Sequence, residues 1–167
     1  MKCRHCSSDL QHTFVDLGSS PPSNSYLTKK TINEPEKWYP LKVLVCDKCW
    51  LVQTEDFVGA SEMFSEDYAY FSSFSSTWLK HAEDYVENIT SKFSINSESL
   101  VVEVAANDGY LLQYVKDKGI PCYGIEPTHS TAEAARNKGI EIIEDFFSVK
   151  KANELLREGR QSDLITS

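Results

Sequence analysis

The sequence LVVEVAANDGYLL at residues 100–112 decides the fold. It begins with a short apolar run that ends at the acidic Glu103, and it then continues through the polar residues 105–109. After that point the apolar residues follow the spacing of a helix that ends near Gly119. This pattern predicts a buried strand, a tight turn and a helix. Such a turn places free backbone N–H groups and the positive end of a helix at the carboxyl edge of a sheet, where nucleotide-like ligands bind.

The turn after Glu103 is a degenerate form of a glycine-rich nucleotide turn. An acid-x-Gly-x-Gly-x-Gly pattern would place glycine at the alternate positions that Ala105, Asn107 and Gly109 occupy here. Asparagine tolerates a positive φ better than most residues, and alanine has the smallest side chain after glycine. From spacing alone, a cofactor turn and an ordinary β–α connection fit this stretch equally well.

Acidic residues follow the next two predicted strands. Residues 122–126, CYGIE, predict a second strand that ends in Glu126, roughly 20 residues after the turn. A carboxylate at this place accepts hydrogen bonds from ribose hydroxyls; a solvated acid before a loop is the alternative. Asp145 and Phe146 follow the third predicted strand, at Ile140–Ile143. They are candidates for the adenine amino group and the adenine face, although a helix-capping acid and a core ring fit the same positions.

The strand and helix pattern predicts half of a doubly wound sheet. Three β–α units are followed by Ser162–Ile165, which begin a fourth strand, and the sequence ends at Ser167. Further strands and helices would cover the other edge of such a sheet. We therefore expect this chain to be an N-terminal piece of a longer protein.

Two C-x-x-C pairs, Cys3 with Cys6 and Cys46 with Cys49, predict a second, smaller structure at the N-terminus. Paired cysteines of this kind form knuckles that hold a tetrahedral Zn²⁺ through four thiolates. We predict one structural zinc ion per chain in a module with little core of its own. A redox dithiol is the weaker alternative, because no thioredoxin-like pattern surrounds either pair.

Two segments have less regular patterns. Residues 17–41, rich in Pro, Ser and Asn, predict an extended loop whose Tyr26, Trp38 and Tyr39 pack on the zinc module. Residues 55–76 are rich in acids, aromatics and serines. Such a segment would cover a cofactor with the hydroxyl of Tyr68 or Tyr70 near the reacting centre, but from the residues alone a linker that fills a domain interface is favoured.

Composition limits the class of protein. The 167 residues carry a net charge of −8 and no basic run longer than two residues, which argues against a nucleic-acid partner. No apolar stretch approaches the roughly 20 residues of a membrane span, and the N-terminus lacks a signal-peptide core. We expect a soluble, cytoplasmic protein with a zinc module at residues 1–55, a bridge and helix at 56–98, and half of a cofactor-binding domain at 99–167.

The whole chain resembles the N-terminal part of the bacterial S-adenosylmethionine (SAM)-dependent sugar C-methyltransferases, which act on nucleotide-linked keto-deoxysugars. The matching pieces lie in one order along the chain and are CRHC, LGSSPPSNSY, YPLKVLVCDKCWLVQ, FSEDYAYFSSFSSTWLKHAEDY, VVEVAANDGYLLQYV, GIEPT, GIEIIEDFF and SDLITS. The resemblance implies a class I methyltransferase fold of the α/β, Rossmann-like type behind the zinc-binding module.

The resemblance also implies roles for individual residues. The turn from Glu103 to Gly109, with Ala105, Asn107 and Asp108, would cradle the methionine part of SAM, and Glu126 would bind its ribose. Asp145 and Phe146 would border the adenine. The stretch from Tyr68 to Ser73 would close over cofactor and sugar, with Tyr70 or Tyr68 as a catalytic hydroxyl on the substrate side.

The family's chemistry removes a proton next to a ketone, and the enolate then attacks the methyl group of SAM. The family's general base, usually a histidine after the fourth strand, would lie outside this sequence. A different class of protein, a non-catalytic zinc-ribbon interaction module fused to a nucleotide-binding-like α/β domain, remains the alternative. The sequence does not specify the sugar, the methylated carbon or the oligomeric state.

Overall fold

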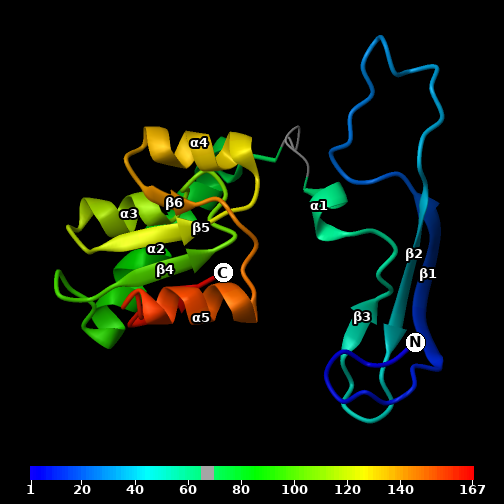
Figure 1. The fold of residues 1–167 in the computed structure, drawn as a ribbon, viewed down its shortest axis with the longest axis horizontal. Helices are drawn as coiled ribbons and strands as arrows, with labels where there is room; N and C mark the ends of the chain where they lie inside the picture. Colours follow the sequence, from blue (N-terminus) through cyan, green and yellow to red (C-terminus); the bar gives the residue numbers. More distant parts are fainter. Residues whose placement is uncertain (65–69) are drawn as a thin grey trace. The chain divides into compact units, whose positions relative to one another are not determined.

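The computed structural model describes residues 1–64 and 70–167 and divides the chain into two compact units, Met1–Ser65 and Glu66–Ser167. Figure 1 shows the first unit in blue to cyan and the second in green to red. Each unit has its own sheet. No helix in the described ranges is long and apolar enough to cross a membrane.

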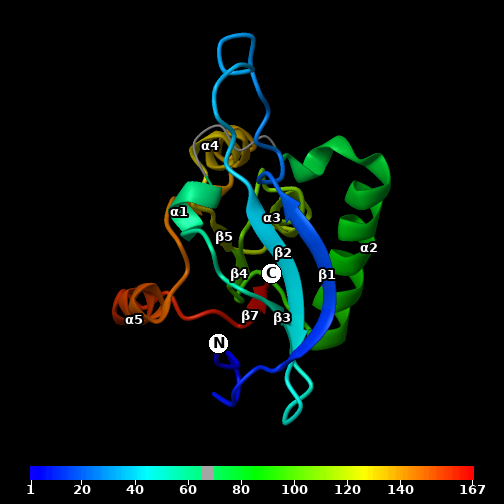
Figure 2. The same ribbon diagram turned by 90° about the vertical axis from the view of Figure 1, so that its right-hand side faces the viewer.

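The first unit is a three-stranded antiparallel sheet. Its strands β1 (His12–Ser20), β2 (Tyr39–Val45) and β3 (Val52–Thr54) lie in that order, and a short helix, α1 (Ala60–Met63), follows. In Figure 2 the long strands β1 and β2 run side by side. The β2–β3 hairpin contains the second cysteine pair at its turn.

The loop prediction for residues 17–41 was wrong at both ends. Strand β1 extends to Ser20. Its pairing with β2 shifts register at a bulge between Asp16 and Ser19, where Gly18 has a φ of 78°. Such bulges let a strand continue through a sequence that alternates poorly. The predicted packing was also wrong for Tyr26 and Trp38, which are exposed by 76% and 59%, whereas Tyr39 is half-buried.

The second unit is a parallel sheet with the strand order β6-β5-β4-β7. Its strands are β4 (Val101–Val104), β5 (Cys122–Ile125), β6 (Glu141–Ile143) and β7 (Leu164–Thr166). The connecting helices are α3 (Leu112–Asp117), α4 (His129–Asn137) and α5 (Val149–Arg157). The order reverses at β4, so the switch point of the sheet lies next to the turn at residues 105–109. The predicted half of a Rossmann-like sheet is confirmed.

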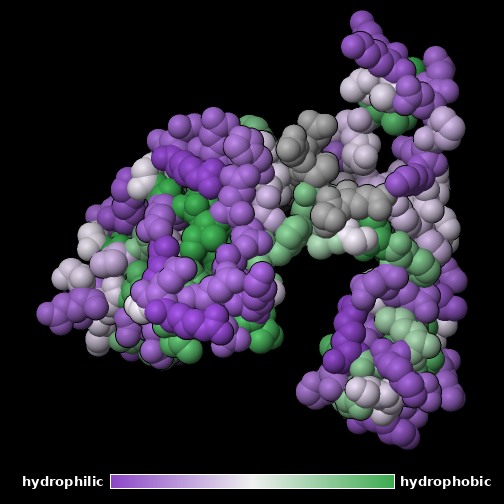
Figure 3. All heavy atoms as spheres, in the orientation of Figure 1, coloured by the Kyte–Doolittle hydropathy of each residue, from purple (hydrophilic) through white to green (hydrophobic). Residues whose placement is uncertain are grey.

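Helices cover both faces of this sheet. On one face, α2 (Ser76–Phe93), α3 and α4 pack on β4 and β6 through an apolar cluster that includes Val86, Leu112 and Ala135. On the other face, α5 packs through Leu155 on Val102 and Ile125. Because strands buried on both faces read as continuous apolar runs, β4 and β5 were recognisable from sequence. Figure 3 shows hydrophobic residues in the band between the mostly hydrophilic surfaces of α4 and α5.

Serine side chains cap the N-termini of α2 and α5. The Ser75 hydroxyl accepts a hydrogen bond from the Trp78 N–H at 3.2 Å, and the Ser148 hydroxyl accepts one from the Lys151 N–H at 3.2 Å. Each cap satisfies a backbone donor that has no partner within its helix. A one-turn 3-10 helix, η1 (Ser72–Phe74), precedes α2.

Candidate functional site

The two cysteine pairs form knuckles of the same backbone geometry. The residue after each pair, Ser7 or Trp50, has a positive φ, of 61° and 63°. The N–H of that residue donates to the carbonyl of the first cysteine of its pair, Cys3 or Cys46, at 3.0 Å in both knuckles. The cysteine spacing predicted the two knuckles, but the positive φ of Ser7 and Trp50 was not predicted, because glycine is the residue expected at such positions.

The four thiols converge on one point. The Sγ atoms of Cys3, Cys6, Cys46 and Cys49 all lie within 4.8 Å of one another, and Cys3–Cys49 and Cys6–Cys46 are each 3.5 Å apart. A tetrahedral site with Zn–S bonds of about 2.3 Å needs sulfurs about 3.8 Å apart, so the cluster suits zinc. Neither His5 nor His12 belongs to it among the described residues.

Backbone and amide donors support the sulfurs. The backbone N–H of Cys6 and the buried amide of Gln53 on β3 hydrogen-bond to Cys3 and lower the pKa of its thiol to about 6. Because the thiolate is the form that binds metal, these contacts favour coordination near neutral pH. Gln53 also accepts a hydrogen bond from the Arg4 N–H at 3.0 Å, which joins the first knuckle to the sheet.

In the second unit, the turn after β4 has the backbone of a glycine-rich turn although two glycines are replaced. Ala105, Asn107 and Gly109 have φ values of 59°, 50° and 74°. Gly109 is required for a second reason, since a Cβ there would lie 2.5 Å from Ile140 Cδ1. The degenerate sequence therefore keeps the alternating positive-φ residues of a glycine-rich turn.

Ala105 is expected to be strained at its φ of 59°, because left-handed backbone costs an L-residue roughly 1–2 kcal/mol. Ala105→Gly removes this strain but adds flexibility to the unfolded chain, so we expect a net stabilisation of about 0.5–1 kcal/mol in urea denaturation. Ala106→Gly is the matched control. Ala106 is buried and is not among the positive-φ residues, so its substitution should destabilise the second unit. Equal effects at the two positions would contradict the strain.

Glu103 is a buried carboxyl group at the end of β4. It is 1% exposed, and burial raises its pKa to about 8, with smaller contributions from Asp108 and Glu126. The Tyr110 hydroxyl hydrogen-bonds to it, and burial together with Glu103 raises the pKa of Tyr110 to about 12. Within the described residues, Glu103 Oε2 and Asp108 Oδ1 are buried without a hydrogen-bond partner. Two unpaired carboxyl oxygens beside one turn suit a cationic group, whose charge would favour the ionised form of Glu103.

Glu126 follows β5 directly and faces the turn. Its Oε2 accepts the Asn107 N–H at 2.9 Å, and its Oε1 accepts the Thr128 N–H at 2.9 Å. Glu126 is 5% exposed. A carboxylate oxygen accepts more than one hydrogen bond, so both oxygens keep capacity for a ligand while the backbone fixes their position.

A segment far away in sequence is attached to this turn. The Ser72 N–H donates to Asn107 Oδ1 at 2.9 Å, the Ser73 N–H donates to Asp108 Oδ2 at 3.2 Å, and Asn107 Nδ2 donates to the Tyr70 carbonyl at 3.1 Å. The structure thus brings Tyr70 and Ser73 to the predicted cofactor turn. Tyr68 lies outside the described residues.

Asp145 and Phe146 lie beyond β6, apart from these hydrogen bonds. Lys151 pairs with Asp145 at 2.8 Å and lowers the pKa of this carboxyl group. Asp145 Oδ1 also accepts the Phe146 N–H at 2.8 Å, and the Phe146 side chain is 38% exposed. Their roles at an adenine ring stay predictions.

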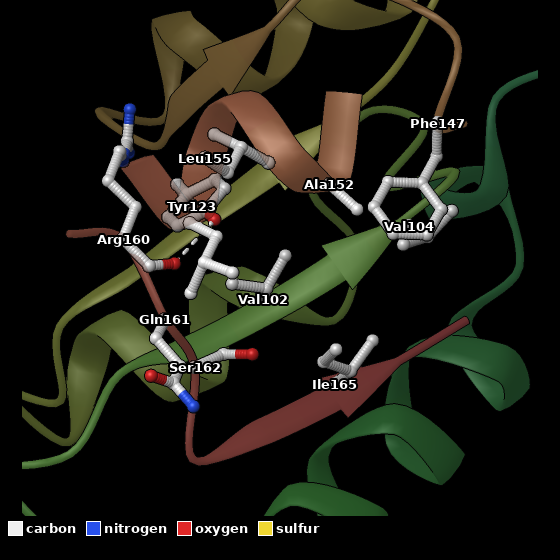
Figure 4. A pocket seen from close by; sticks show the side chains of 11 residues that line it. Val102, Val104, Tyr123, Phe147, Ala152, Leu155, Arg160, Gln161, Ser162 and Ile165 are labelled. Atoms are coloured by element: carbon white, nitrogen blue, oxygen red, sulfur yellow. Dashed lines mark hydrogen bonds between the residues drawn. The ribbon is translucent and has the colours of Figure 1, made fainter. Parts of the chain in front are cut away.

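Two hollows flank the sheet. An apolar one of about 230 Å³, drawn in Figure 4, lies on the α5 face between Val102, Tyr123, Leu155 and Ile165, and none of the predicted cofactor residues lines it. The other, of about 190 Å³, is lined by Trp78, His81, Tyr110 and Thr166 among others. There the Trp78 ring stacks on His81 and Tyr110, with ring centres 5.1 and 6.0 Å apart. Sequence reasoning missed Tyr110, because a tyrosine after a turn carries no motif.

The first unit therefore has the four-cysteine cluster of a zinc-binding module. The second unit has a parallel sheet of the Rossmann-like type, with a turn of positive-φ residues next to its switch point. Residues 3–64 match the family Methyltransf_13, described as "Putative zinc binding domain". The chain is 27% identical to C-methyltransferase NovU of Streptomyces niveus over 154 residues, which is 92% of this chain and 36% of NovU. The chain thus spans about a third of the length of this relative. Residues 3–64 thus match a zinc-binding domain, and most of the chain is similar to a C-methyltransferase.

Proposed function

We propose that the second unit binds S-adenosylmethionine and that the protein containing it is a SAM-dependent C-methyltransferase for a nucleotide-linked keto-deoxysugar. The observation that carries the proposal is the turn at residues 105–109, whose three alternate residues all have a positive φ. The similarity to NovU supports methyl transfer to carbon. We also propose a cytoplasmic location, because four cysteines that stay reduced are typical of proteins in a reducing compartment.

The residues of the turn fit the cofactor. The unpaired oxygens of Glu103 and Asp108 would face the ammonium group of the methionine part, next to the backbone of Ala105, Asn107 and Gly109. Glu126 would accept the ribose hydroxyls, and Asp145 with Phe146 would border the adenine. Bound SAM supplies an electrophilic methyl group. Ser73 and Tyr70 would lie over the site through their attachment to the turn.

The acceptor chemistry follows from methylation at carbon. A keto group acidifies the neighbouring C–H bond, so a general base would accept that proton. The enolate carbon would then take the methyl group that bound SAM would supply, and S-adenosylhomocysteine would be the leaving group. A hydroxyl such as that of Tyr70 would stabilise the enolate oxygen by hydrogen bonding, a role that its 51% exposure leaves open to a substrate.

Glu126→Ala is expected to weaken binding of S-adenosylhomocysteine by about 1.5–3 kcal/mol, the value of a hydrogen bond to a charged group. Calorimetric titration measures this loss. Glu144→Ala is the control, because Glu144 is a carboxylate at the neighbouring strand end that pairs instead with His129 and Arg136. Unchanged affinity of the Glu126 variant would contradict the ribose assignment. No binding by the unsubstituted protein would favour the non-catalytic interaction module.

A further inference from the structure

Lys138, directly after α4, joins three segments of the second unit. Its Nζ donates to the Asp108 carbonyl at 2.6 Å and to the Ser73 hydroxyl at 2.8 Å, and it lies 3.6 Å from Asp108 Oδ2. One ammonium group therefore contacts the cofactor turn and the 70–74 segment while its backbone ends α4.

The charge of Lys138 matters because of its surroundings. Asp108 is 3% exposed and Lys138 is part-buried, with a side chain 31% exposed. A carboxylate removed from water needs a compensating charge or hydrogen bonds, and loss of one partner is more costly there than at the surface. Lys138 supplies that charge and uses its other donors for Ser73 and the turn carbonyl.

The 70–74 segment depends on the same carboxylate. Asp108 Oδ2 accepts the Ser73 N–H, and the neighbouring Asn107 accepts the Ser72 N–H. Without Lys138, the buried carboxylate of Asp108 would lose its compensating positive charge. The Ser73 hydroxyl would lose its hydrogen bond to Lys138 Nζ. Both changes act on the contacts that hold the segment against the turn.

We infer that Lys138 is a positioning residue that holds the 70–74 segment on the cofactor turn, so that Tyr70 and Ser73 are in place when the cofactor binds. It acts through Asp108 and Ser73 and is not itself a ligand. The part that concerns the cofactor rests on the proposed function, whereas the attachment of the segment does not.

The first test measures hydrogen exchange of the ligand-free chain. Lys138→Met is expected to increase the exchange rate of the Ser72 and Ser73 amides by about tenfold or more, because loss of one charged hydrogen bond changes an equilibrium by about that factor. The amides of β5 should stay protected. Lys138→Arg keeps charge and donors and should restore protection. Lys116→Met is the matched control, because Lys116 donates to the Lys138 carbonyl at 2.7 Å. Among the described residues, no hydrogen bond or ion pair joins Lys116 to Ser73 or Asp108.

The second test measures affinity for S-adenosylhomocysteine. Lys138→Met should weaken binding about tenfold, whereas Lys138→Arg should bind as the unsubstituted chain does. The loss of affinity in the double variant Ser73→Ala, Lys138→Met should be smaller than the sum of the losses in the two single variants. A general loss of stability would also affect the Lys116 variant and would not show this rescue.

The outcomes separate the two proposals. Unchanged exchange at Ser72 and Ser73 in Lys138→Met, or an equal change in Lys116→Met, overturns the role of Lys138. If exchange changes as expected but the unsubstituted chain does not bind S-adenosylhomocysteine, the attachment stands and the proposed function of the domain fails.

Discussion

Cys46→Ser is expected to unfold the first unit while the second unit keeps its structure. Among described residues 1–64, the buried hydrophobic side chains are Cys3, Cys46 and Leu44. So small a core cannot offset the conformational entropy of its chain. Structural zinc contributes roughly 10–16 kcal/mol in small zinc-finger peptides, so the metal would dominate the stability of this unit.

The measurement is zinc content together with a backbone NMR spectrum of the whole chain. The variant should lose zinc and the dispersed resonances of β1–β3, whereas those of β4–β7 should persist. Cys122→Ser is the matched control, because Cys122 lies outside the four-thiol cluster. It packs against the core of the second unit, and its Sγ donates to the Leu112 carbonyl at 3.9 Å. A first unit that stays folded without metal would contradict a structural zinc site.

Much of the second unit was predictable because its signals are local. The apolar strand before Glu103, the acid after β5 and the serine caps each depend on a few adjacent residues. In the first unit, the cysteine spacing predicted the cluster, but strand β1 was missed. Its residues Phe14 and Leu17 are 66% and 63% exposed, so the strand lacks the alternating buried face that sequence analysis detects.

The contacts around the cofactor turn were predictable only in part. Glycine-like positions could be found by counting from Glu103, because a positive φ is a property of single residues. The attachment of Ser72 to Asn107 spans 35 residues, and the contact of Lys138 with Ser73 spans 65. Such long-range polar contacts depend on how helices dock, and single-sequence periodicity carries no information on that. The domain limits and the roles of the cofactor residues stay predictions.

Glu103→Gln is expected to stabilise the second unit at pH 8 and above. The folded-state pKa of Glu103 is about 8, raised from 4.5 mainly by burial. Between these two values the folded state holds one proton more than the unfolded state. Stability therefore falls as pH rises from 4.5 to 8 in the unsubstituted chain. The neutral glutamine avoids this loss, which is on the order of 5 kcal/mol for a shift of this size.

Denaturation of both proteins from pH 4 to 9 measures the difference directly. The two stabilities should be similar near pH 4, and the gap should widen with pH until it levels off above pH 8. Glu144→Gln is the control, because its effect on stability should depend on pH in the opposite direction. Arg136 lowers the pKa of Glu144, so its charge stabilises the folded state above the unfolded pKa and that contribution is lost on acidification. A pH-independent gap for Glu103→Gln would show that the buried carboxyl group ionises normally. A gap that narrows when S-adenosylhomocysteine is bound would show that the ligand's ammonium group compensates the charge of Glu103.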